Sequence, residues 1–237
     1  MNITIPGIVE EPGLGTGKVG TLEAPSGGAL NMHTIKGQVA VITGAAGGIG
    51  QALALDMTRR GAAGIALVDF SDRVVQVARE INAEAGRQIA IAYRGDTTDT
   101  AFRQEVYADV TARAGVPRIC VPAAAITREA LAVRIDKQTG RVVIYPMEDF
   151  RKVVEINMIA PIYWAIELVA AVAKDRASRG LKRWQPEEGL QGAVVFLGSI
   201  ASVGNVGQIS YSSTKAGLEG AASTLMAESM YYGSAAA

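Results

Sequence analysis

Tyr211 and Lys215 are the residues whose types and spacing most directly predict a chemical function for this chain. They stand four positions apart in the run Tyr-Ser-Ser-Thr-Lys, and Ser199 precedes Tyr211 by twelve positions. On a helix, residues four apart lie on one face, one turn above the other. A nearby ammonium group favours the ionised form of a phenol, which alone holds its proton until about pH 10. The pair therefore predicts that Tyr211 acts as a general acid or base. Without other signals, a tyrosine and a lysine four residues apart more often belong to an ordinary amphipathic helix.

A glycine-rich turn in the first half of the chain favours the chemical interpretation. The apolar strand predicted over 39–43 leads through Gly44-Ala-Ala-Gly-Gly-Ile-Gly50 directly into a helical pattern. Glycines let the backbone approach a pyrophosphate, and the helix N-terminus supplies free N–H groups and a positive dipole end. The second predicted strand ends at Asp69, nineteen residues past Gly50, where a carboxylate can accept bonds from an adenosine ribose. The alternative for Asp69 is a cap or turn residue before Ser71.

Asp69 also bears on which nicotinamide cofactor is bound. A carboxylate at this place repels a 2′-phosphate, and positions 45–47 hold no lysine or arginine to neutralise one. We therefore expect NAD(H) rather than NADP(H). Arg73 lies close enough in sequence to weaken this preference, so NADP(H) stays an alternative.

The alternation of short β-branched runs with longer helical patterns predicts an α/β fold, a doubly wound parallel sheet in three layers. We expect strands over 39–43, 64–69, 88–93, 118–122 and 192–198, and helices over 48–60, 72–86, 99–114, 148–174 and 209–231. Two insertions interrupt this rhythm. Residues 132–145 alternate like a hairpin around Asp136 to Gly140, and 179–189 form a polar loop with Trp184. Either could border a substrate entrance, but a surface excursion is the simpler interpretation.

Length and composition limit the other possibilities. The 237 residues suit one domain over 37–237 with an irregular extension over 1–36. Basic and acidic residues balance at twenty-three each, which predicts no nucleic-acid partner. Cys120 lies in an apolar run and is expected to be a buried thiol, while His33, the only histidine, cannot build a metal site alone. The start of the chain resembles neither a secretion signal nor a membrane anchor, so we expect a cytoplasmic protein without membrane contact.

Taken together, Thr43-Gly44-x-x-x-Gly48-x-Gly50, Asn157, Ser199 and Tyr211-x-x-x-Lys215 resemble the short-chain dehydrogenases/reductases over about residues 37–233. The resemblance implies that Ser199 polarises a carbonyl, Tyr211 transfers the proton, Lys215 binds the nicotinamide ribose, and Asn157 holds a water in a proton relay. Asn157 lies in an apolar helix, where an unpaired amide would cost about 1–3 kcal/mol, so a functional partner is the economical explanation. Asp96 matches the aspartate that meets the adenine ring, although it could simply end a turn. The implied cofactor contacts are Gly44, Gly48, Ile49, Gly50, Asp69, Asp96, Ala124, Tyr211 and Lys215, with no metal.

The chain departs from the family pattern in two places. Where the family has Asn-Asn-Ala-Gly, this chain has Pro122-Ala-Ala-Ala-Ile126, so two amides are absent and Ala125 carries a methyl near the expected nicotinamide ribose. The family also continues after the Tyr-Lys helix with a sixth strand and a substrate loop, whereas this sequence ends at Ala237. We therefore expect residues 191–198 to be an uncovered apolar edge of an incomplete chain, with a rearranged partner contact as the alternative.

These observations predict an NAD(H)-dependent oxidoreductase that acts on a secondary alcohol or ketone, by analogy with the oxoacyl-thioester reductases of the family. The alternative is a catalytically impaired dinucleotide-binding or scaffold protein. The resemblance also implies a homodimer or homotetramer assembled through the helices at 148–174 and 209–231.

Overall fold

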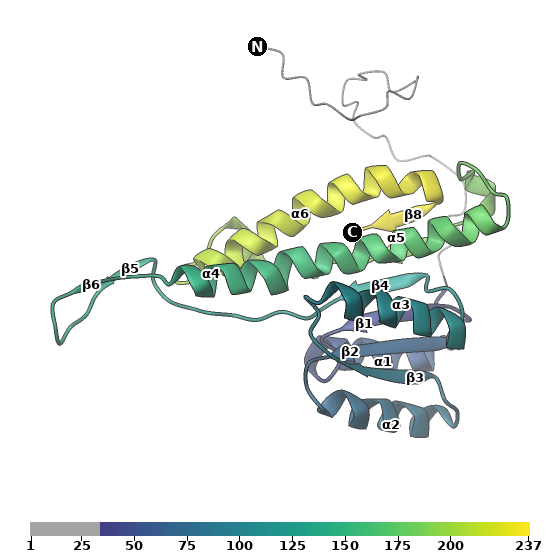
Figure 1. Cartoon of the computed structure of the whole chain (residues 1–237), viewed down its shortest axis with the longest axis horizontal. Helices are drawn as coiled ribbons and strands as arrows, with labels where there is room; N and C mark the ends of the chain where they lie inside the picture. Colours follow the sequence, from purple (N-terminus) through teal and green to yellow (C-terminus); the bar gives the residue numbers. More distant parts are fainter. Residues whose placement is uncertain (1–33) are drawn as a thin grey trace, which may run out of the picture. The chain divides into compact units, whose positions relative to one another are not determined.

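Six parallel strands form the central sheet of the computed structural model, which describes residues 34–237 (Figure 1). Their order is β3-β2-β1-β4-β7-β8, so the order reverses between β1 and β4. The bounds are β1 Val39–Thr43, β2 Gly64–Asp69, β3 Ala90–Arg94, β4 Ile119–Pro122, β7 Gly192–Val194 and β8 Ser234–Ala236. A doubly wound sheet of this order binds ligands at the carboxyl ends of its strands, beside the reversal. The predicted α/β class is confirmed, and the predicted extension falls largely outside the described residues.

The helices lie close to the predicted ranges. They are α1 Gly48–Arg59, α2 Arg73–Ala85, α3 Thr100–Ala114, α4 Met147–Val154, α5 Ala160–Ser178 and α6 Ile209–Ser229. A π-helical turn over Glu155–Ile159 joins α4 to α5, so the helix expected over 148–174 is one run with an internal irregularity. Such turns are frequent at functional sites.

Alternate residues of the buried strands supply two separate apolar layers. In β1, Ala40 and Ile42 pack toward α1 and α2, whereas Val39 and Val41 pack toward α3, α5 and α6. This is the expected period of two for a strand covered on both faces. Fully burying one such valine or isoleucine contributes about 1.5–3 kcal/mol. Figure 1 shows α5 and α6 on one side of the sheet and α1 and α2 on the other.

One helical run in the described residues, Met147–Ser178, has the length and apolar composition to cross a membrane. Within it Trp164 and Leu168 are fully buried in the layer against the sheet, and Val172 is also fully buried. The run is therefore a core helix of this fold.

The edge formed by β7 is covered, contrary to our expectation. Residues Ser234–Ala236 form β8 and pair in parallel with β7, and the N–H of Phe196 donates to the carbonyl oxygen of Ala237 at 2.7 Å. The prediction was wrong because a three-residue strand of serine and alanine carries none of the β-branched pattern that marks a strand.

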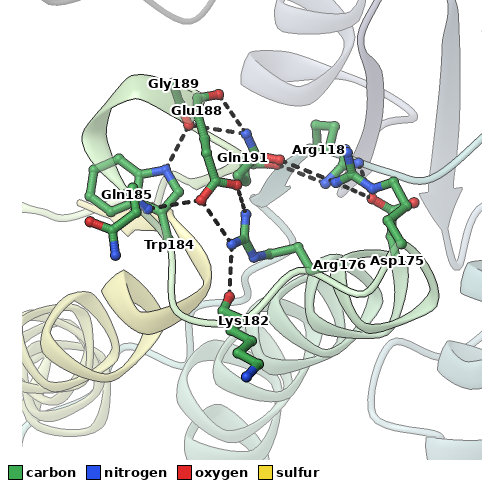
Figure 2. Close-up of polar contacts among 10 residues, drawn as sticks. Arg118, Asp175, Arg176, Lys182, Trp184, Gln185, Glu188, Gly189 and Gln191 are labelled. Atoms are coloured by element: carbon green, nitrogen blue, oxygen red, sulfur yellow. Dashed lines mark hydrogen bonds and ion pairs between the residues drawn. The ribbon is translucent and has the colours of Figure 1, made fainter.

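The insertion before β7 is held in place by several hydrogen bonds (Figure 2), and we call residues 179–191 the clamp. Arg176, at the end of α5, is 1% exposed, and its Nη1 lies 2.6 Å from Oε2 of Glu188. Its Nη2 donates to the carbonyl oxygen of Lys182 at 2.8 Å, and Nε1 of Trp184 donates to Gly189 at 2.8 Å. The backbone N–H of Trp184 donates to Tyr231 at 2.9 Å. These bonds fasten the insertion to the segment that leads into β8.

The insertion after β4 forms the predicted hairpin. Its strands are β5 Val133–Ile135 and β6 Val142–Ile144, which pair antiparallel. Figure 1 shows this hairpin extending away from the sheet and its helices. We call residues 132–145 the arm.

Candidate active site

A cleft of about 500 Å³ lies at the carboxyl ends of the strands, where the strand order reverses. Its walls include the ends of β1, β2 and β3 and the segment after β4. Among the lining residues are Gly44, Asp69, Asp96, Ala124, Ile126 and Ile156. Four of the nine predicted cofactor-binding positions therefore line this cavity, namely Gly44, Asp69, Asp96 and Ala124.

The glycine turn between β1 and α1 depends on close backbone packing. Gly44 has φ +67°, and a Cβ there would lie 2.8 Å from the backbone nitrogen of Ala124. A Cβ at Gly50 would overlap the carbonyl group of Gly44, whereas one at Gly48 would meet no protein atom. Helix α1 has no side-chain cap and no acidic residue in its first turn, and Ile49 there is exposed. The turn thus leaves the first N–H groups of α1 available to an anion.

Asp69 forms the turn that we considered and also lines the cleft, and its contact with a ribose stays a prediction. Its Oδ2 accepts a hydrogen bond from the N–H of Ala46 at 2.9 Å, and its Oδ1 accepts one from the N–H of Ser71 at 2.8 Å. The carboxylate therefore ties the glycine turn to the end of β2 while it lines the cleft. Each oxygen keeps a second acceptor site that a ribose hydroxyl could use.

Asp96 likewise sits in a turn and on the cleft wall. Its Oδ1 accepts bonds from the N–H of Thr98 at 2.9 Å and from its hydroxyl at 2.8 Å. The structure thus provides the turn that we considered, and an adenine contact stays a prediction.

Asn157 lies in the π-helical turn, 1% exposed. Its Oδ1 accepts from the N–H of Ile126, and its Nδ2 donates to the carbonyl oxygen of the same residue, both at 2.8 Å. The buried amide therefore has a structural partner, which the sequence did not reveal. Its place in a proton relay stays a prediction.

The segment after β4 lacks the two asparagine side chains that the family has there, and other groups hold it in place. The hydroxyl of Thr43 accepts a bond from the N–H of Ala124 at 3.1 Å, and the amide of Asn157 holds Ile126. A threonine at the end of the apolar run of β1 is the one sequence signal that could have pointed to this contact.

Within residues 34–237, no three histidine, cysteine, aspartate or glutamate side chains lie close enough together to hold a metal ion.

Tyr211 and Lys215 lie together on α6, as their spacing predicted. The Lys215 Nζ lies 5.5 Å from the centre of the Tyr211 ring and donates to the carbonyl oxygen of Leu197 at 2.6 Å. Lys215 is 5% exposed, and this burial lowers the pKa of its ammonium group. Removing an ammonium from water disfavours its charged form.

Ser199 follows Leu197 by two residues, so the bond from Lys215 ties α6 to the segment that carries this serine. The Ser199 Oγ accepts from the N–H of Ala201 at 3.1 Å at the start of a short 3₁₀ turn. Strands β4 and β7 are neighbours in the sheet, so the segments after them leave the same edge. The Ser199, Tyr211 and Lys215 positions therefore belong to the edge that holds the cleft.

Comparison with known proteins identifies the family. The family model for short chain dehydrogenases matches residues 38–234. The chain belongs to the short-chain dehydrogenase family. Members of this family are oxidoreductases, as their name states, and the resemblance inferred from the sequence is confirmed.

Curated relatives of this short-chain dehydrogenase include the 3-oxoacyl-(acyl-carrier-protein) reductase of Pseudomonas aeruginosa. It is 29% identical over 190 residues, which cover 79% of this chain and 66% of the relative. The 3-hydroxyacyl-CoA dehydrogenase type-2 of Rattus norvegicus is 30% identical over 196 residues, which cover 81% and 67%. The chain thus spans about two thirds of the length of the relatives that it matches.

Proposed function

We propose that this chain is an NAD(H)-dependent oxidoreductase that transfers a hydride between nicotinamide and a secondary alcohol or ketone. The observation that carries the proposal is the buried Lys215 ammonium beside the ring of Tyr211, at the sheet edge that also holds the cleft. In this mechanism Tyr211 gives its proton to the oxygen of the ketone as the alkoxide develops, and recovers it in the reverse direction. Lys215 holds the nicotinamide ribose, and Ser199 orients the carbonyl oxygen.

The residues of the glycine turn fit a dinucleotide. The uncapped N-terminus of α1 would hold the pyrophosphate, because its first N–H groups lack side-chain partners and Gly48 faces open space. Asp69 would accept bonds from the adenosine ribose. When bound, the nicotinamide supplies or accepts the hydride at its C4 atom.

The side chains around Asp69 support NAD(H) as the cofactor. Its carboxylate faces the cleft, and Arg73 is directed to Gln51, with Nη2 3.3 Å from Oε1. Arg94 pairs with Asp72 at 2.8 Å. Both nearby arginines thus have partners other than a 2′-phosphate.

A 3-oxoacyl or 3-hydroxyacyl thioester is the substrate class that we favour. The names of the relatives describe such substrates. In this chain, Ile200, Val203 and Val206 follow Ser199 closely and are highly exposed, with Ile200 at 95%. Exposed apolar side chains next to the reacting carbonyl would suit an acyl chain.

Helices α5 and α6 support assembly of the protein into a homodimer or homotetramer. Ile162 and Ile166 of α5 and Leu225 of α6 line a shallow groove between the two helices, and Ile166 is exposed. Packing the same groove of two copies together would remove this apolar surface from water.

Replacement of Tyr211 by phenylalanine tests the proposed chemistry. We expect Tyr211→Phe to reduce NADH-dependent reduction of an acetoacetyl thioester by about 10²–10⁴-fold, the usual contribution of a general acid. NADH binding, followed by fluorescence, should change little. Tyr231→Phe, at a half-exposed tyrosine away from the cleft, is the matched control and should keep full activity. Wild-type protein that binds NADH but turns over no ketone or alcohol would favour the impaired binding protein instead.

Fluorescence titration with both reduced cofactors tests the assignment of NAD(H). We expect NADH to bind at least about tenfold more tightly than NADPH, a difference of about 1.4 kcal/mol. Asp69→Asn should narrow this ratio, because the amide oxygen can still accept from Ala46 while the charge is removed. Tighter binding of NADPH by the wild-type protein would overturn the assignment.

A further inference from the structure

The arm presents an apolar face that the described part of the protein leaves uncovered. Val133 stands opposite Ile144, and Ile135 stands opposite Val142, so the four side chains share one face of the hairpin. Each is between 59% and 72% exposed. Such a group of β-branched residues is unusual on the surface of a monomeric protein.

The two strands of the arm have few contacts with the rest of the domain, which holds the arm at its base through the Tyr145 hydroxyl. Among the described elements, β5 and β6 pack extensively only with each other, and Figure 1 shows them beyond the body of the domain. A two-stranded hairpin is marginally stable in water unless further strands or a helix support it. A third and fourth strand would provide that support.

The two edges of the arm differ in charge. Strand β5 carries Arg134 and is followed by Asp136. Charged residues such as these commonly prevent an exposed edge strand from pairing with another chain. The β6 edge reads Val142-Val143-Ile144 and carries no charge between Arg141 and Tyr145. The uncharged edge is therefore the one open to another strand.

The hydrogen bonds of the hairpin determine which backbone groups of β6 are free. The N–H of Asp136 donates to Arg141, and the N–H of Tyr145 donates to Ala132. In an antiparallel pair the bonded positions alternate, so Arg141, Val143 and Tyr145 face β5. The N–H and C=O groups of Val142 and Ile144 consequently point outward.

We propose that β6 pairs antiparallel with β6 of a second copy of this chain, about a two-fold axis at Val143. In this register Val142 lies opposite Ile144 of the second copy, so the outward backbone groups bond to each other. Arg141 lies opposite Tyr145, and no like charges meet. A two-fold pairing of β5 through its own outward groups, centred on Arg134, would instead bring two guanidinium groups together. The resulting four-stranded sheet joins the apolar faces of both arms.

This contact is separate from the groove between α5 and α6, and it does not depend on the proposed chemistry. The arm lies between β4 and α4, and none of its residues lines that groove. A two-fold contact closes on itself and therefore produces a discrete pair of chains at this surface.

Disulfide trapping tests the proposed pairing. The only native cysteine, Cys120, is buried, and burial raises the pKa of its thiol to about 12, so an introduced thiol is the reactive one. In the proposed register the two Val143 Cα atoms lie about 4.5 Å apart, because they form a non-bonded antiparallel pair. This separation suits a disulfide. We expect Val143→Cys to give a covalent dimer under mild oxidation.

Arg134→Cys is the matched control, because Arg134 is the cross-strand neighbour of Val143 in the same arm. Its counterpart in the second copy would be three strand spacings away, about 14 Å, so it should stay monomeric on a non-reducing gel. Failure of Val143→Cys to cross-link, or equal cross-linking of both variants, would overturn the proposal.

A mass measurement gives a second readout. Val142→Pro would remove an outward N–H that bonds to the second copy while leaving the bonds between β6 and β5 in place, so we expect the mass in light scattering to fall by half with an unchanged circular dichroism spectrum. An unchanged mass would contradict the pairing.

Discussion

Lys215 is a charged residue that the fold buries beside Tyr211. Its ammonium group is removed from water, which is costly for an isolated charge. The carbonyl oxygen of Leu197 accepts one of its three N–H bonds, and the ring of Tyr211 lies nearby. Two donor positions are left, which is what contact with ribose hydroxyls would require.

The lowered pKa of Lys215 predicts how cofactor affinity depends on pH. As pH rises, the buried ammonium group loses its proton below the value of 10.5 that an ordinary lysine shows. If this ammonium binds the ribose, NADH affinity measured by fluorescence should fall in that range. Lys215→Met keeps most of the volume of the side chain, and it should bind NADH more weakly and without this fall. A wild-type affinity that stays constant up to pH 10.5 would contradict the assignment.

At the residue scale, the sequence predicted the identities in the site but few of their partners. Tyr211 and Lys215 meet because helical geometry alone brings them together. The contacts of Asn157 with Ile126, and of Lys215 with Leu197, involve backbone atoms from segments far apart in sequence. Side-chain types give no information about such atoms, so only the fold could reveal them.

Among the elements, the clamp over 179–191 and strand β8 form one unit. Trp184 packs so closely on Gly233 that a Cβ at this glycine would overlap its indole ring. The N–H of Gln191 also donates to Gly233 at 2.8 Å. The polar insertion therefore supports the last strand of the sheet, a role that its composition did not indicate.

Substitution of Gly233 tests this unit. Gly233 has φ +75°, and we expect Gly233→Ala to lower the free energy of unfolding by about 1–3 kcal/mol through overpacking, beyond the backbone strain. Gly180→Ala is the control, because Gly180 has φ +71° and no atom within 4 Å of an added Cβ. Urea titration should show the larger loss for Gly233→Ala. Equal losses would mean that the indole moves aside freely.

The sequence predicted elements well where their patterns are strong and poorly where they are short. The five expected strands and five helical ranges all occur, with ends shifted by a few residues. The π-helical turn was hidden, because its residues continue the apolar pattern of the helix. Strand β8 was missed because Ser-Ala-Ala has no alternation to detect.

For the whole molecule, the two insertions lie at opposite ends of the sheet. The arm follows the carboxyl end of β4, at the edge that carries the cleft, whereas the clamp precedes the amino end of β7. In a doubly wound sheet the carboxyl edge binds ligands. The clamp thus stabilises the far end of the sheet, while the arm extends from the end that holds the cleft.

The bond from Tyr145 to Ala132 closes the base of the arm. Because the two ends meet there, the path from β4 to α4 would remain continuous if the strands between them were deleted. Related chains could therefore gain or lose the arm by a single insertion or deletion, without a change in the dinucleotide cleft.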